Sequence, residues 1–126
     1  MKNRRPSFQI ALFVVLIVFA GVVPATLSAQ EGVPEKPIQL EATKEFQGAN
    51  AIAALKWRDM SDNELGFEVL RADNSGEFRV VGMVGANTPR YRDKVGKYIA
   101  GSFTYKVRAF NEAGKSQDSN ASSVWF

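Results

Sequence analysis

The sequence predicts an all-β protein that folds as an antiparallel β-sandwich. Beyond the N-terminal region, apolar and polar residues alternate with a period of two, and no stretch shows helical spacing. Clusters of Asp, Asn, Ser and Gly, which favour tight turns, separate these patterns at regular intervals. No segment has the pattern of the crossover helix that parallel strands require. We therefore expect seven short strands in two antiparallel sheets.

The first 29 residues have the order of a secretory signal peptide. A basic start is followed by 14 residues without a polar side chain (10–23) and then by small residues up to Ala29, where we expect cleavage. The alternative is an uncleaved membrane anchor, because the apolar stretch nearly reaches the length of a bilayer span if it extends to Leu27. We expect an exported protein that is periplasmic, bound to the cell surface or released, with a membrane contact only if this segment is retained.

A short linker is predicted at 30–37, because this stretch holds two prolines and three charged residues. The predicted domain then covers 38–126. Such a domain, of about 90 residues, is large enough to be stable on its own hydrophobic core without disulfides.

The clearest predicted strand is 102–110, in which Phe103, Tyr105, Val107 and Ala109 alternate with polar residues and so share one face. Two further strands are predicted at 51–57, which ends in Trp57, and at 65–72, with Phe67 and Val69 on the inner face. Shorter strands are predicted at 38–43, 77–84, 89–93 and 119–126.

The composition removes several classes of function. From Gln30 onward there are 13 basic and 13 acidic residues, so the predicted domain lacks the positive field that nucleic-acid binding needs. The chain has no Cys and no His, which removes disulfides, thiolate chemistry and the commonest general base and transition-metal ligand. We therefore expect a non-enzymatic protein with no cofactor and no metal.

The stretch WRDMSDNELGF (57–67) is the strongest candidate for chemistry, because it places Asp59, Asp62 and Glu64 close together. The spacing fits a calcium loop poorly, since Leu65 stands where that motif has Gly. We expect a turn in which Asp, Ser and Asn side chains bond to local backbone amides. The alternative is a small exported hydrolase or a calcium-dependent protein that uses these three carboxylates.

Four features in order resemble a fibronectin type III domain of the bacterial kind, over roughly Pro37 to Phe126. They are Trp57 at the end of a strand and the passages DMSDNELGFEVLR, VGANTPRYRD and FTYKVRAFNEAGKS. The resemblance implies an immunoglobulin-like sandwich of three strands against four. It also matches Trp57 to the family's core tryptophan and Tyr105 to its sixth-strand tyrosine. Together with Phe67 and Val107, which alternation places on inner faces, they form the expected structural core.

The same resemblance implies a role for the Tyr105 hydroxyl, which would bond to a backbone group near Ile99, in the loop before its strand. Gly101 stands where the family usually has Pro nearby, so this loop is expected to be looser than in the family.

The resemblance also places the loops 58–64, 85–89 and 111–115 at one end of the sandwich. The candidate binding residues on these loops are Asp62, Asn63, Asn87, Asn111, Glu112 and Lys115, and the one large apolar residue is Met60. Such a polar surface suits weak contacts with a protein or a carbohydrate partner. We therefore expect a binding or spacer module whose partner the sequence does not identify.

Overall fold

The computed structural model describes residues 32–126, and the predictions for 1–29 lie outside this range. Val33 to Phe126 form one compact unit. Pro34 and Pro37 are buried, so the last part of the predicted linker packs against the domain. Within residues 32–126 we find no helix with the length and apolar character needed to cross a bilayer.

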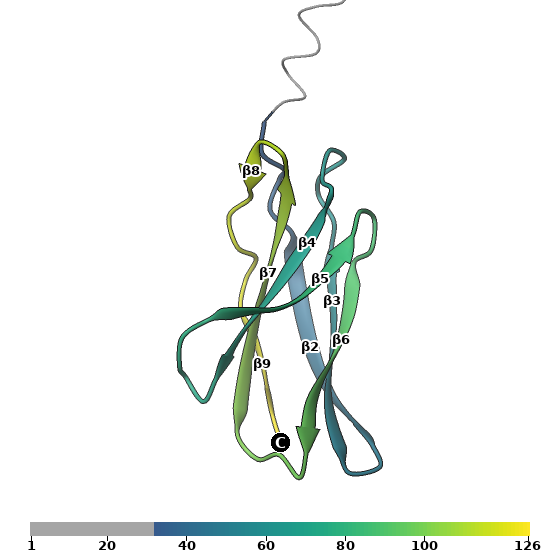
Figure 1. Cartoon of the computed structure of the whole chain (residues 1–126), viewed down its shortest axis with the longest axis vertical. Helices are drawn as coiled ribbons and strands as arrows, with labels where there is room; N and C mark the ends of the chain where they lie inside the picture. The colour runs from purple at the N-terminus through teal and green to yellow at the C-terminus, as the bar shows by residue number, and fades with distance from the viewer. Residues whose placement is uncertain (1–31) are drawn as a thin grey trace, which may run out of the picture. The chain divides into compact units, whose positions relative to one another are not determined.

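The described residues form two antiparallel sheets, as the sequence predicts (Figure 1). The three-stranded sheet has the order β2-β3-β6, and the five-stranded sheet has the order β5-β4-β7-β8 with β9 also paired to β7. The strands are β2 Ile38–Gln47, β3 Asn50–Arg58, β4 Gly66–Asp73, β5 Arg79–Gly85, β6 Arg90–Lys97, β7 Ser102–Asn111, β8 Gly114–Lys115 and β9 Ser122–Trp125.

β9 lies within the seventh strand predicted at 119–126, whereas β8 lies in the predicted loop 111–115. β8 pairs with Phe110 and Asn111, whereas β9 pairs with Ser102 to Tyr105 at the other end of β7. Because β4 occupies the opposite edge of β7, both pieces lie along the same edge. The predicted arrangement of three strands against four is therefore correct when β8 and β9 are counted as one strand with a break.

Two serine hydroxyls maintain the hydrogen bonding across this break. The amides of Val107 and Ala109 donate to the side chains of Ser119 (3.0 Å) and Ser116 (2.9 Å). In return, the amides of the two serines donate to the carbonyls of Val107 and Ala109, at 2.8 Å each. The buried donors of β7 are thus satisfied although the neighbouring segment is not a regular strand.

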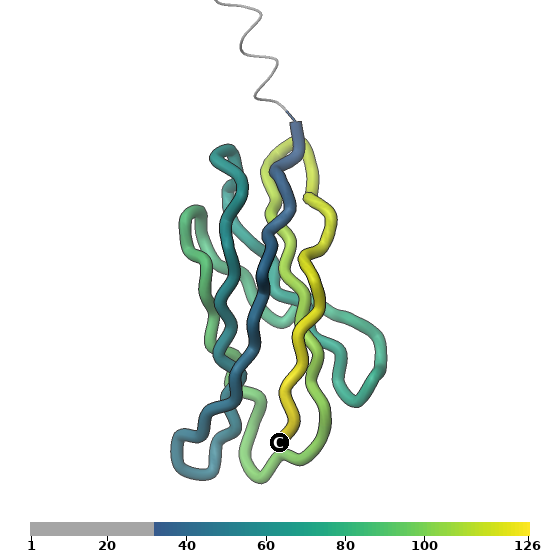
Figure 2. The backbone as a smooth tube through the Cα atoms, turned by 180° about the vertical axis from the view of Figure 1, so that it is seen from behind, coloured from purple at the N-terminus to yellow at the C-terminus, as the bar shows by residue number. Residues whose placement is uncertain are grey.

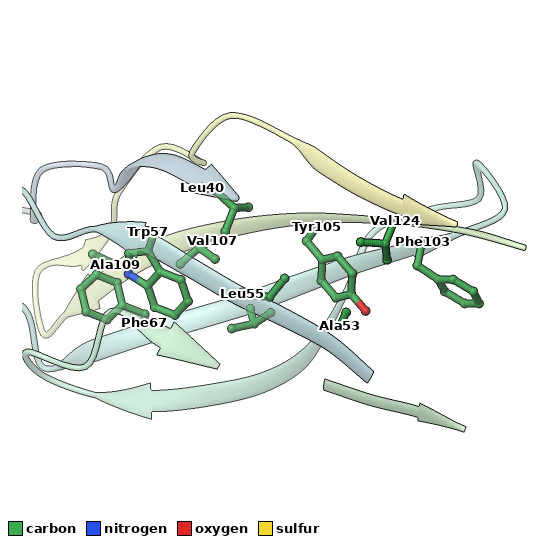
Figure 3. Close-up of a cluster of buried hydrophobic side chains, with 11 residues drawn as sticks. Leu40, Ala53, Leu55, Trp57, Phe67, Phe103, Tyr105, Val107, Ala109 and Val124 are labelled. Carbon is green, nitrogen blue, oxygen red and sulfur yellow. The ribbon is translucent and has the colours of Figure 1, made fainter. Parts of the chain in front are cut away.

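The core lies between the sheets and uses the inner-face residues that alternation predicts (Figure 3). Phe67, Val69, Tyr105 and Val107 are fully buried, and Trp57 is 6% exposed. The Trp57 and Phe67 rings meet edge to face, with centroids 5.4 Å apart. The indole N–H of Trp57 has no hydrogen-bond acceptor among the described residues, and the Phe67 ring lies beside it.

A charged group also lies in this core, and it corrects the expected role of Tyr105. The Tyr105 hydroxyl donates to Oδ2 of Asp93 on β6 at 2.7 Å, rather than to a backbone group near Ile99. Nη1 of Arg71, on β4, donates to the same oxygen at 2.8 Å. Arg71 also forms an ion pair with Asp73 through its Nε at 2.6 Å. This network joins the two sheets at a depth where an unpaired charge would be costly.

Side chains near the end of the chain join the open edge of β2 to the other sheet. The Leu40 amide donates to Oδ1 of Asn120 at 2.9 Å, and Nδ2 of Asn120 donates to the Leu40 carbonyl at 3.0 Å. The Ala42 amide donates to the Ser122 hydroxyl at 3.0 Å. Figure 2 shows β2 running beside the last segment of the chain. The Asn120 carboxamide therefore replaces a strand partner along this edge.

Candidate binding surface at the loop end

The loops 58–64, 85–89 and 111–115 lie at one end of the domain, as the resemblance implies, and we call this end the loop end (Figure 1). Two hydrogen bonds tie the loops together. The Asn87 amide donates to Oε2 of Glu64 at 3.1 Å, and Nδ2 of Asn111 donates to the Asn63 carbonyl at 3.2 Å. The loop between β3 and β4 is therefore fastened to both other loops.

The loop between β3 and β4 is organised around Ser61. Its amide and its hydroxyl both donate to Oδ1 of Asp59, at 3.0 and 3.2 Å, which forms the expected local turn. The hydroxyl also lies 2.9 Å from Oε1 of Glu64. Glu64 is only 7% exposed, and its carboxylate acts as a structural acceptor for its own loop and for the loop between β5 and β6.

The carboxyl groups of Asp59 and Glu64 have opposite pKa shifts. Burial raises the pKa of Asp59, the Ser61 amide opposes that shift, and the nearby Glu64 adds to it. Burial would also raise the pKa of Glu64, but hydrogen bonds led by the one from the Asn87 amide outweigh it and lower that pKa. Glu64 is therefore the group of this pair that the fold stabilises as an anion.

The other two loops have turns that suit their residues. Asn87 has a φ of 57°, a left-handed conformation that Asn tolerates better than most residues. In the hairpin between β7 and β8, the Ala113 amide donates to Oδ1 of Asn111 at 2.8 Å. Asn111 thus shapes its own turn and also holds the loop between β3 and β4.

The six candidate binding residues differ in how accessible they are. Asp62, Asn87 and Glu112 are exposed at the loop end, whereas Asn63 and Asn111 are half-buried and take part in the contact between loops. Lys115 is exposed, but its Nζ lies 3.2 Å from the Glu68 carboxylate of β4. These assignments remain predictions for binding.

Part of the apolar surface at this end was not predicted from the sequence. Met60 is 44% exposed, as expected for a loop residue, but Leu65 and Val33 are also 56% and 51% exposed. Leu65 was expected inside a strand, whereas β4 begins only at Gly66. Val33 falls in the predicted linker, yet its side chain lies next to Gly114 in the hairpin between β7 and β8. A helpful signal was the glycine after Leu65, which can end the regular alternation.

The alternative catalytic or calcium loop is not assembled as a set of three carboxylates. Asp59 and Glu64 both bond to Ser61, while Asp62 is exposed. Within residues 32–126, no group of three or more His, Cys, Asp or Glu residues is arranged to hold a metal ion.

Comparison with known proteins supports the fold. No protein-family model matches the chain, and no curated protein matches it in sequence. Among solved structures, it resembles an Fn3-like protein from Clostridium thermocellum, with a TM-score of 0.56 and 20% identity over 71% of this chain and 90% of that one. It also resembles the FN1-FN3 domains of chicken CNTN1, with a TM-score of 0.60 and 14% identity over 75% of this chain and 32% of that one.

Enzyme chains also contain segments similar to this fold. A β-1,2-glucanase from Parabacteroides distasonis matches with a TM-score of 0.59 and 23% identity over 75% of this chain, but the match covers only 12% of the glucanase. The chain thus spans a small part of that enzyme and about a third of the chicken fragment. Together with the two-sheet topology, these matches show that residues 32–126 have the fibronectin type III fold.

Proposed function

We propose that the protein is an exported, non-enzymatic module that binds a protein or carbohydrate partner through its loop end. The observation that carries this proposal is the fastening of three loops by the Glu64–Asn87 and Asn111–Asn63 hydrogen bonds. A surface held in one conformation loses less conformational entropy when a partner binds. Binding residues also lie most often on loops that a rigid scaffold positions.

The composition of the loop end suits a modest interface. Val33, Met60 and Leu65 supply exposed apolar area, and Asp62 and Glu112 supply a polar rim. Protein interfaces commonly combine an apolar centre with a polar rim, and Met adapts well to irregular partners. We expect the apolar residues to contribute most of the affinity.

A non-enzymatic role is supported by the hydrogen bonds that occupy the candidate carboxylates. Glu64 accepts a hydrogen bond from the Asn87 amide and Asp59 accepts one from the Ser61 amide, while the single hydroxyl proton of Ser61 lies within reach of both carboxylates. General acid–base catalysis needs carboxyl groups that can reach a substrate proton. In this loop the carboxylates of Asp59 and Glu64 are instead hydrogen-bonded within the turn and to the neighbouring loop.

A capture experiment with matched variants tests the loop end. Three proteins would be crosslinked in parallel to the exported proteins of the host. They are the full chain, the variant Met60→Ala/Leu65→Ala and the control Tyr98→Ala. Tyr98 is 88% exposed and lies near the turn between β2 and β3, at the other end of the domain. A partner lost from the loop variant and kept by the control would support the proposal. Equal capture by all three proteins would reject the loop end as the binding surface.

Export needs its own measurement. The intact mass of the protein from its native host should correspond to a chain that begins near Gln30, in a soluble fraction. A full-length mass in the membrane fraction would instead favour the retained anchor.

A further inference from the structure

A group of cations shares the outer face of the three-stranded sheet. Lys56 and Arg58 lie on β3, and Arg90, Arg92 and Lys94 lie on β6; we call this group the cationic face. The register places Lys56 directly opposite Arg90, and Ala54 directly opposite Arg92. The alternating residues of β3 (Ala53, Leu55 and Trp57) face the core, so these cations project from the other side.

Only part of this charge is compensated among residues 32–126. Lys56 forms an exposed ion pair with Glu41 at 3.4 Å, and Arg92 pairs with Glu45. Because Glu45 is on β2 and Arg92 is on β6, the second pair spans the central strand β3. Arg58, Arg90 and Lys94 form no ion pair within the described part of the chain. The face therefore keeps an excess of positive charge although the domain as a whole is balanced.

The position of Lys56 and Arg90 argues for a role beyond solubility. Like charges directly opposite each other on paired strands are destabilising. Cations on an edge strand such as β6 can prevent sheets from joining edge to edge. That explanation does not apply to Lys56 and Arg58, because β3 is the central strand and has no free edge. An anion bound between the two strands would relieve the repulsion.

Two open hollows on the molecule meet at Lys56. The first, of about 460 Å³, is lined by Ala54, Leu55, Lys56, Arg90, Tyr91 and Arg92. The second, of about 380 Å³, is lined by Gln39, Glu41, Lys56, Trp57 and Arg58. Together they extend from β6 across β3 to β2. This open shape fits an extended chain better than a compact small molecule.

We propose that the cationic face binds a carboxylated polysaccharide. Guanidinium groups match carboxylates in a fork geometry, and Lys adds a point charge. Cations two residues apart on one strand are separated by roughly 7 Å, and those on neighbouring strands by about 5 Å, so a polymer with repeated charges can engage several at once. This surface is distinct from the loop end, so either proposal can fail without the other.

Other anionic partners fit the face less well. Single-stranded nucleic acids use exposed aromatic rings as stacking platforms. The aromatic residue of the first hollow, Tyr91, is half-buried, packs next to Gly82 and donates its hydroxyl to the Val81 carbonyl at 3.4 Å. For an anionic membrane, the face offers no exposed large apolar side chain that would enter the bilayer. Phe46, the exposed aromatic residue on β2, instead turns its ring toward Phe126, with ring centroids 5.8 Å apart.

The test measures binding of the full chain to immobilised polygalacturonate, with neutral dextran as the uncharged counterpart. We expect binding to polygalacturonate only, weakening as salt is raised. The variant Arg58→Ala/Arg90→Ala should bind at least about tenfold more weakly, because it removes two uncompensated charges. The control Arg79→Ala/Lys106→Ala removes the same charge from the five-stranded sheet and should stay within about twofold.

Several outcomes would overturn the proposal. They are no binding to polygalacturonate, equal binding to dextran, or equal weakening by both double variants. Tighter binding to single-stranded DNA, or to vesicles of phosphatidylglycerol and phosphatidylcholine, would assign the face to a different partner. Circular dichroism and a thermal melt of each variant would establish that the comparison is made between folded proteins.

Discussion

The Tyr105 hydroxyl and the Asp93 carboxylate join the two sheets through a hydrogen bond of 2.7 Å inside the core. Arg71 donates to the same carboxylate oxygen, so a single atom of Asp93 accepts from two residues of the five-stranded sheet. Burial, followed by the bond to Asp93, raises the pKa of Tyr105, which stays a neutral donor. The role that the family resemblance gives to the backbone is filled here by a buried acid.

This network predicts unequal costs for its members. Tyr105→Phe removes one hydrogen bond and should lower the free energy of unfolding by about 1 to 3 kcal/mol. Asp93→Ala should cost more, about 3 to 5 kcal/mol, because the Arg71 guanidinium stays buried but loses one of its two carboxylate partners. Urea denaturation of both variants gives the order. If Asp93→Ala proved the milder change, the Arg71–Asp73 pair would be sufficient to hold the Arg71 charge.

A second prediction compares the core with the loop end. Trp57→Ala removes a buried ring that packs on Phe67 and should cost about 3 to 5 kcal/mol. Asp62→Ala, at an exposed position, should cost less than about 0.5 kcal/mol. Urea melts of the two variants test this. A large loss for Asp62→Ala would mean that the loop has a structural role beyond the Ser61 turn.

The third prediction concerns Asp59, whose pKa is raised in the folded state. A raised pKa means that the ionised carboxylate is less favourable in the folded than in the unfolded protein. The stability that the protonated Asp59 contributes at low pH is therefore lost as the pH rises through the folded pKa. Asp59→Asn removes that charge and keeps an Oδ1 acceptor for Ser61. We expect a small rise in Tm at pH 7 and none at a pH below about 3, where Asp is protonated. A lower Tm at pH 7 would show that the carboxylate is needed.

The fourth prediction concerns Glu68, whose side chain lies 2.8 Å from Arg108 Nε and 3.2 Å from Lys115 Nζ. Burial would raise the pKa of Glu68, but these two partners outweigh it and lower the pKa. A lowered pKa gives stability that is fully present above about pH 5 and is lost as the pH falls through the folded pKa. Glu68→Gln should therefore reduce the loss of Tm between pH 6 and pH 3. Equal slopes for wild type and Glu68→Gln would contradict this assignment.

The fifth prediction concerns the break in the last strand. Ser119→Ala leaves the buried Val107 amide without its acceptor and should cost about 1 to 3 kcal/mol. Ser123→Ala, which removes an exposed hydroxyl paired with Thr104, should cost less than about 0.5 kcal/mol. Thermal melts compare the two serines directly. Similar small losses would indicate that water replaces the Ser119 hydroxyl.

Alternation along single strands predicted much of the fold. It placed Phe67, Val69, Tyr105 and Val107 in the core, and the turn residues marked the loops. The same alternation could also have placed two charged residues in the core, because Arg71 is two residues after Val69 and Asp93 is two residues after Tyr91. Both charged residues therefore had inward-facing positions. Their pairing needed the spatial neighbourhood of β4 and β6, which belong to different sheets.

The loop end was predicted less completely, because its contacts join distant segments. The positions of the three loops followed from the family resemblance. The exposure of Leu65 depends on where β4 begins, and that of Val33 on how the segment before β2 packs beside Gly114. Strand ends are set by a balance of weak local preferences, so they are harder to infer than strand centres.

The hydrogen bonds between Leu40 and Asn120 also have a consequence for how the chain folds during synthesis. They join residues 80 positions apart, so this edge of the sandwich can form only after Asn120 has left the ribosome. Contacts between such distant residues slow folding, because the intervening chain must be ordered first. A nascent chain that stays open until its last segment emerges can still be threaded through a narrow secretory channel, which fits the export that we propose.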